Sequence, residues 1–228
     1  MAVWGNEAQI AFVLFAAALP LALIPLVYFH YKRHGRFSGW TAFLTIATFL
    51  YVAGLVAFTL FPLPNTATDY CDARTSGVTW QFVPFSSLAD IASEVSAVGV
   101  VGAASSVVVL QVVFNILLLV PLGMLLAYRY KRSFGFTVAF GLGISLVIEL
   151  TQGTAVWGLF ECPYRLADVD DLITNTLGAA IGWVIGRALT PYLPDADPPR
   201  ANDDDPPRPS RRVLAGALDI LAYLVVGV

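Results

Sequence analysis

The chain has 228 residues, of which 57% are hydrophobic and only 13% are charged. Soluble globular domains usually carry about 25% charged residues, so this composition indicates a protein built for lipid. The formal net charge of -3 includes no concentrated basic patch of the kind that nucleic-acid binding requires. We therefore predict an all-α polytopic integral membrane protein without a nucleic-acid partner.

Five apolar stretches are long enough, or nearly so, for the ~20 residues that a helix needs to cross a bilayer. They lie at 8–31, 38–61, 107–128, 134–151 and 172–189. A sixth stretch, 213–228, is short and contains Asp219, so a tilted span, an interfacial helix and a hairpin all fit it. The sequence predicts five to six transmembrane helices.

The basic residues are unevenly distributed along the chain. Eleven of the thirteen Lys and Arg residues lie in segments 32–36, 129–132 and 187–212. By the positive-inside rule these segments face the cytoplasm, which places the N-terminus and the loops 62–106 and 152–171 outside. The first apolar run has no basic residue before it, so we expect a retained helix rather than a cleaved signal peptide. The protein is predicted to be a multi-pass protein of the cell membrane.

These features divide the chain into five predicted segments. They are an N-terminal two-helix hairpin (1–62), an extracellular loop (63–106), a three-helix core (107–190), a disordered cytoplasmic linker (191–212) and a C-terminal membrane segment (213–228). In the outer loop, Ser87 and Asp90 have the spacing of a capping box. A short amphipathic helix at about 88–98 along the membrane surface and a solvated loop with one helical turn both fit this pattern.

Cys71 and Cys162 are the only cysteines, and the predicted topology places both outside. An oxidising exterior permits a disulfide. Sequence does not reveal whether the two Cα atoms come within bonding range, so a bridge and two unpaired thiols both stay open.

The segment 165–183, RLADVDDLITNTLGAAIGW, holds most of the polar residues of the core. On a helix, Asp168, Asp171 and Asn175 fall at i, i+3 and i+7 and share one face. Gly178 and Gly182 repeat a small residue at four-residue spacing, which lets a neighbouring helix approach closely. Acidic residues at the mouth of a membrane helix are costly, so they need a partner, a cavity or a function.

Two other spans carry polar residues at a similar predicted depth. Asn115 is interpreted as a helix–helix hydrogen bond, Pro121 as a kink, and Gly123 follows in the same span. We predict that three spans together form one outward-facing polar pocket. Its ligand-binding candidates are Asn115, Glu149, Gln152, Arg165, Asp168, Asp171 and Asn175.

Two interpretations of this pocket stay open. In the structural one, Arg165 neutralises an acid, amides cap the others, and the acids occupy a helix N-terminus favourably. In the functional one, the pocket binds a polar head group, a cation or both. Carboxylates without His or Cys suit a hard cation such as Mg²⁺ or Ca²⁺, but the DxDD string is weakly specific and we assign no metal or cofactor.

Catalysis is equally open. Both histidines lie at the cytoplasmic end of the first span, which disfavours a Ser–His or Cys–His hydrolase on the outer side. Any catalysis there would use the carboxylates as acid or base.

Three motifs, taken in order, resemble the VanZ-like family of bacterial membrane proteins. They are FNILLLVPLG (114–123), SLVIELTQ (145–152) and RLADVDDLITNTLGA (165–179). QFVPF (81–85) is similar to an upstream loop motif that usually begins with Asn in the family. The resemblance covers about 81–186. The family pattern carries over onto Asn115, Pro121, Gly123, Glu149, Gln152, Arg165, Asp168, Asp171, Asn175 and Gly178.

The resemblance implies a membrane protein linked to low-level resistance to teicoplanin-type lipoglycopeptides, without a catalytic assignment. Three functions are therefore considered. The protein engages an amphipathic lipid or lipoglycopeptide from the outer leaflet, or it is a membrane enzyme acting on a lipid-linked envelope precursor, or it is a structural or accessory subunit. The oligomeric state stays open.

Overall fold

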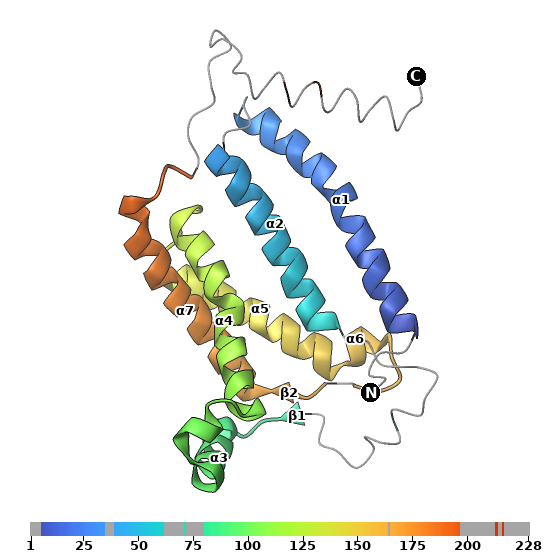
Figure 1. Ribbon diagram of the computed structural model, residues 1–228, viewed down its shortest axis with the longest axis vertical. Coiled ribbons are helices and arrows are strands. Elements are labelled where there is room, and N and C mark those ends of the chain that lie inside the picture. The colour runs from blue at the N-terminus through green and yellow to red at the C-terminus, as the bar shows by residue number, and fades with distance from the viewer. Residues whose placement is uncertain are drawn as a thin grey trace.

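The computed structural model describes residues 6–34, 39–61, 71, 80–163, 165–196, 213 and 216. Its elements follow in chain order (Figure 1): α1 (Asn6–His34), α2 (Gly39–Leu60), β1 (Trp80–Gln81), α3 (Ser86–Ala103), α4 (Val107–Tyr128), α5 (Phe134–Gly153), α6 (Ala155–Gly158), β2 (Ala167–Asp168), α7 (Val169–Leu189) and the 3-10 helix η1 (Thr190–Tyr192). Except for residues 213 and 216, the predicted C-terminal membrane segment lies outside the described residues, as does most of the predicted linker.

Five helices (α1, α2, α4, α5 and α7) are long and apolar enough to cross a membrane. The predicted all-α polytopic membrane architecture is therefore confirmed. The direction in which the chain crosses the membrane stays a prediction.

The helices α4, α5 and α7 form the core (Figure 1). At Gly178 of α7 an added Cβ would lie 2.0 Å from the Ile116 carbonyl oxygen. At Gly182 it would lie 2.0 Å from the Val120 carbonyl oxygen. From the α4 side, an added Cβ at Gly123 would lie 2.1 Å from the Ala179 carbonyl oxygen. The two backbones therefore touch directly, which only a residue without Cβ permits at these positions. Pro121 lies inside α4 in this contact region.

The α1–α2 hairpin reaches the core through long side chains. The Tyr51 hydroxyl of α2 donates to the Leu118 carbonyl of α4 at 2.9 Å. The Trp40 indole N–H donates to the Tyr128 hydroxyl at 2.6 Å. These contacts hold the hairpin beside α4 without close backbone approach.

The first residues of the predicted disordered linker are folded. Leu193 packs against a small cluster of Leu44, Tyr128 and Ala196. The Tyr128 hydroxyl also donates to the Pro194 carbonyl. The segment is ordered here because its two apolar side chains cover apolar surface at the ends of α2 and α4.

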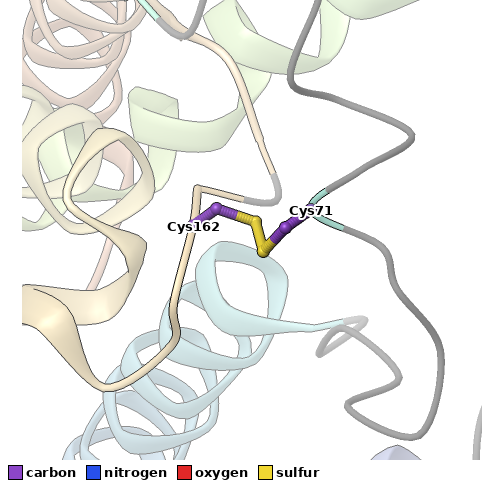
Figure 2. The surroundings of a disulfide bond; sticks show 2 residues. All are labelled: Cys71 and Cys162. Atoms are coloured by element: carbon purple, nitrogen blue, oxygen red, sulfur yellow. A yellow bond between two sulfur atoms is a disulfide. The ribbon is translucent and has the colours of Figure 1, made fainter.

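Two short connections are tied together beside the end of α5. The strands β1 and β2 pair in parallel, with Trp80 opposite Ala167. Their side chains pack over Gly153, where an added Cβ would lie 2.6 Å from the Trp80 ring. A disulfide joins Cys71 to Cys162 with a Cα–Cα distance of 5.8 Å (Figure 2). It links the segment that follows α2 to the segment that precedes β2.

Of the two alternatives for 88–98, the structure contains the helix, and it is longer than that range: α3 extends over Ser86–Ala103, with non-helical backbone angles at Gly99 (φ 75°, ψ 167°). The predicted capping box does not start it. Phe85 occupies the N-cap in a left-handed conformation (φ 65°) and makes no side-chain capping bond. The cap comes from another part of the chain, as described below.

Candidate functional site

The candidate site lies where α7 begins. Asp168 has extended backbone angles (φ -126°, ψ 131°) and is the N-cap of α7. Its Oδ1 accepts a hydrogen bond from the Asp170 N–H at 2.9 Å. The expectation that Asp168 shares a helical face with Asp171 and Asn175 is wrong, because Asp168 pairs in β2 and precedes the helix.

Asp171 connects α7 to α4. The Asn115 side-chain amide of α4 donates to Asp171 Oδ1 at 2.5 Å. The contact forms because glycines further along both helices bring α4 and α7 close together. The interpretation of Asn115 as a helix–helix hydrogen bond fits this geometry.

Asn175 connects α7 to α5, one turn beyond Asp171. Its side-chain N–H donates to Ser145 Oγ at 3.1 Å, and Ser145 Oγ donates to the Asp171 carbonyl at 3.4 Å. Both side chains are almost fully buried, with Asn175 only 1% exposed. Within the described part of the chain, the buried Asn175 Oδ1 has no hydrogen-bond partner.

Ser145 was not among the predicted site residues. Its position one helical turn before Glu149 in SLVIELTQ is the signal that could have identified it.

Glu149 is buried (3% exposed) on α5. Its Oε2 accepts a hydrogen bond from the Asp168 backbone N–H at 2.9 Å, which fixes the end of β2 against α5. Gln152 is also buried further along α5. Glu149 joins α5 to β2, and Ser145 joins α5 to α7.

Arg165 is directed toward the end of α2. Its guanidinium donates to the Phe61 carbonyl at 2.8 Å and lies 5.9 Å from the centre of the Phe58 ring. The structure thus brings five of the seven predicted residues together with Ser145 in one group. Within it, hydrogen bonds link Asn115, Asp171, Ser145 and Asn175, and a separate bond joins Glu149 to Asp168. We call this group the polar cluster; its members are Asn115, Ser145, Glu149, Asp168, Asp171 and Asn175.

Asp170 has a separate function that sequence reasoning missed. It is buried (4% exposed), and its Oδ1 accepts from the Phe85 N–H at 2.5 Å. Its Oδ2 accepts from the Ser87 N–H at 2.8 Å and from the Ser86 hydroxyl at 3.3 Å. Free N–H groups at a helix start need an acceptor, and a carboxylate of α7 supplies it for α3. The unassigned middle acid of the DxDD string was the available signal.

The site is rich in hydrogen-bond acceptors. Burial raises the pKa of the Asp168 carboxyl, and the nearby carboxylates of Asp170 and Asp90 raise it further. The hydrogen bond from the Asp170 N–H lowers this pKa, but the net shift is upward. Among the residues that the structure describes, no group of three or more His, Cys, Asp or Glu side chains is arranged to hold a metal ion. The arrangement is suited to a ligand that brings hydrogen-bond donors or a positive charge.

A family model described as VanZ/LLP1 matches residues 48–190, well over half of the chain. The chain belongs to the VanZ/LLP1 family. The match starts within α2, so it extends beyond the motifs that first suggested this family. It includes all of α4, α5 and α7 and every member of the polar cluster. No curated protein and no solved structure matches the chain.

Proposed function

We propose that this VanZ-family protein holds the polar head group of an amphipathic lipid or lipoglycopeptide at the polar cluster. In doing so it lowers susceptibility to teicoplanin-type lipoglycopeptides. The observation that carries the proposal is the Asn175 side chain, whose buried Oδ1 lacks a partner among the described residues. A buried acceptor left unsatisfied costs about 1–3 kcal/mol. A cluster that only fastened helices would gain by satisfying it, so this acceptor supports a role in binding.

The chemistry of the cluster indicates the class of ligand. Glu149 and Asp171 supply carboxylate oxygens, and Asn175 supplies an amide oxygen. Hydroxyl or ammonium groups on a head group would complement these acceptors. Such bonds are stronger where water is excluded, and the predicted topology opens this end of the core toward the outer leaflet.

The first test compares native protein with Asp171→Asn in a teicoplanin-sensitive Gram-positive host. The variant keeps an oxygen that can accept from Asn115 and removes only the charge. We expect the native chain to raise the inhibitory concentration of teicoplanin and the variant to lose most of that protection at equal membrane abundance. Glu161→Gln is the matched control, because Glu161 is an exposed acid outside the cluster, and it should protect like the native chain. Equal protection by Asp171→Asn would contradict the proposal.

A second variant separates binding from helix fastening. Asn175→Leu removes the unpartnered acceptor and also the N–H that bonds Ser145 Oγ. Ser145→Ala is the matched control, because it removes the same bond and leaves the acceptor in place. Compared with Ser145→Ala, protection should fall further in Asn175→Leu while thermal stability in detergent is similar. A purely structural role predicts lower stability and lower membrane abundance in this variant, which would favour the accessory-subunit hypothesis.

A further inference from the structure

A second feature lies beside the polar cluster and has no part in it. Large apolar side chains are exposed along residues 82–101, which comprise most of α3 and the turn before it. They are Phe82 (72% exposed), Val83 (62%), Phe85 (60%), Leu88 (60%), Val98 (54%), Val100 (72%) and Val101 (89%). A concentration of exposed large apolar side chains in one short segment is typical of a membrane or partner contact.

The amino-acid pattern of α3 separates its apolar and charged positions. Leu88, Ile91 and Val95 are spaced by three and four residues, so they lie on one face of the helix. Asp90 and Glu94 are one turn apart on a different face. Over residues 88–98 the helix therefore has the one-sided character of a segment that lies at a membrane surface. The backbone leaves helical geometry at Gly99 (φ 75°, ψ 167°), so Val100 and Val101 lie beyond a kink and outside this periodicity.

The apolar surface continues into a membrane span. Residues 104–106 connect α3 to α4, and the Ser106 hydroxyl caps α4 by accepting from the Val109 N–H. Val107 at the start of α4 is 80% exposed and Leu110 is 40% exposed. In a transmembrane helix these side chains face lipid. Figure 1 shows α3 next to the N-terminal end of α4, at the same end of the bundle as β1 and β2. Lipid is thus the occupant that is continuous with an existing lipid-facing surface.

The start of this segment is held to the core at one point. The buried Asp170 carboxylate accepts hydrogen bonds from the Phe85 N–H, the Ser87 N–H and the Ser86 hydroxyl. Asp170 lies between Asp168 and Asp171 of the polar cluster. The first turn of α3 is therefore set at the level at which α7 begins.

We infer that residues 82–101 bind the bilayer interface, with their apolar side chains among the head groups and upper acyl chains. Asp170 is the positioning residue that holds this segment at the depth of the polar cluster. The inference is independent of the proposed function, since it concerns lipid contact and not a drug or a head group bound in the cluster.

The test measures the depth of single positions. Val101→Cys is made in the protein with its native disulfide intact, labelled with a nitroxide and reconstituted in phosphatidylethanolamine–phosphatidylglycerol vesicles. Accessibility to oxygen and to a water-soluble nickel chelate is then compared with that of labels at Asp90→Cys and Val147→Cys. Asp90 is an exposed acid of α3, and Val147 is exposed on the span α5. We expect the oxygen-to-nickel ratio at position 101 to exceed that at position 90 severalfold and to approach that at position 147. Equal nickel accessibility at positions 101 and 90 would overturn the inference.

The positioning role is tested by adding Asp170→Ala to each labelled variant. We expect the label at position 101 to become at least twofold more accessible to nickel, while position 147 keeps its depth and the disulfide persists on non-reducing gels. An unchanged depth at position 101 would show that lipid alone holds the segment. A parallel change at position 147 would show that Asp170 supports the whole fold. Either result would overturn the positioning role, and neither depends on drug susceptibility.

Discussion

The two parts of the membrane region are held together in different ways. In the core, α4 and α7 touch backbone to backbone at Gly178 and Gly182. The α1–α2 hairpin instead reaches α4 through the tips of Tyr51 and Trp40. The difference is visible in burial: 28% of the α7 span is buried, against 6% of the α1 span.

This contrast explains where the polar cluster lies. Its residues come from α4, α5 and the start of α7, the region in which backbone contact fixes the distances between helices. Functional groups are held in place best by rigid elements. The family match leaves α1 outside and includes the whole core together with part of α2 and all of α3. The shared part of the family therefore contains the closely packed part of this protein.

The largest effect should come from adding one methyl group to the core contact. In Gly182→Ala the new Cβ would lie 2.0 Å from the Val120 carbonyl oxygen, and neither backbone can move without separating the helices. Overpacking of this kind costs about 3 kcal/mol. Thermal unfolding in detergent should show a clearly lower midpoint.

The matched control for this change is Gly54→Ala in the hairpin, where an added Cβ meets nothing within 4 Å. Its free energy of unfolding should equal that of the native protein or exceed it by up to about 1 kcal/mol, because alanine favours the helical conformation more than glycine does. Equal midpoints for the two variants would mean that the core is not packed more closely than the hairpin.

The next effect concerns the covalent link between the two regions. The Cys71–Cys162 disulfide spans 91 residues and joins the segment after α2 to the connection before β2. Replacing both cysteines with serine should lower the free energy of unfolding by about 2–3 kcal/mol. Reductant should lower the midpoint of the native protein and leave the double variant unchanged. A native midpoint that is insensitive to complete reduction would refute this prediction.

A smaller effect distinguishes the polar contacts of the two regions. Asn115→Leu removes the donor to Asp171 Oδ1 and leaves a partly buried carboxylate without that donor, at a cost of about 1–2 kcal/mol. Tyr51→Phe removes a bond to the Leu118 carbonyl, which also lies within a helix and has a backbone partner. Its cost should be near the ~0.6 kcal/mol average for hydrogen bonds in membranes. The reverse order of the two midpoints would contradict this assignment.

The sequence predicts what local periodicity encodes. Apolar length predicted the five candidate spans, and the spacing of Gly178 and Gly182 indicated a close helix contact of the kind that the structure contains. Asp168 was misplaced on the helical face because its i, i+3, i+7 spacing with Asp171 and Asn175 does not reveal that it pairs in β2 and caps α7 in an extended conformation.

The contacts between distant segments follow no such period. The pairing of Trp80 with Ala167 and the capping of α3 by Asp170 each join positions more than eighty residues apart. The local sequence around Ser87 instead suggested a capping box, because a side chain from another helix can supply the same acceptor. Only the folded chain reveals which acceptor is used.

The smallest effect lies at the edge of the core, at Asp168. Asparagine caps a helix as well as aspartate does, so Asp168→Asn keeps the bond from the Asp170 N–H and removes the charge.

Burial raises the pKa of Asp168 in the folded state, so the folded protein binds this proton more tightly than the unfolded chain. The contribution of Asp168 to stability is therefore greatest below its unfolded pKa of about 3.9 and is lost as the pH rises through the folded value. Unfolding midpoints measured from pH 4 to pH 7 should show Asp168→Asn gaining stability relative to the native protein as the pH rises. A difference that stays constant or shrinks over this range would mean that Asp168 is not held in a carboxylate-disfavouring environment.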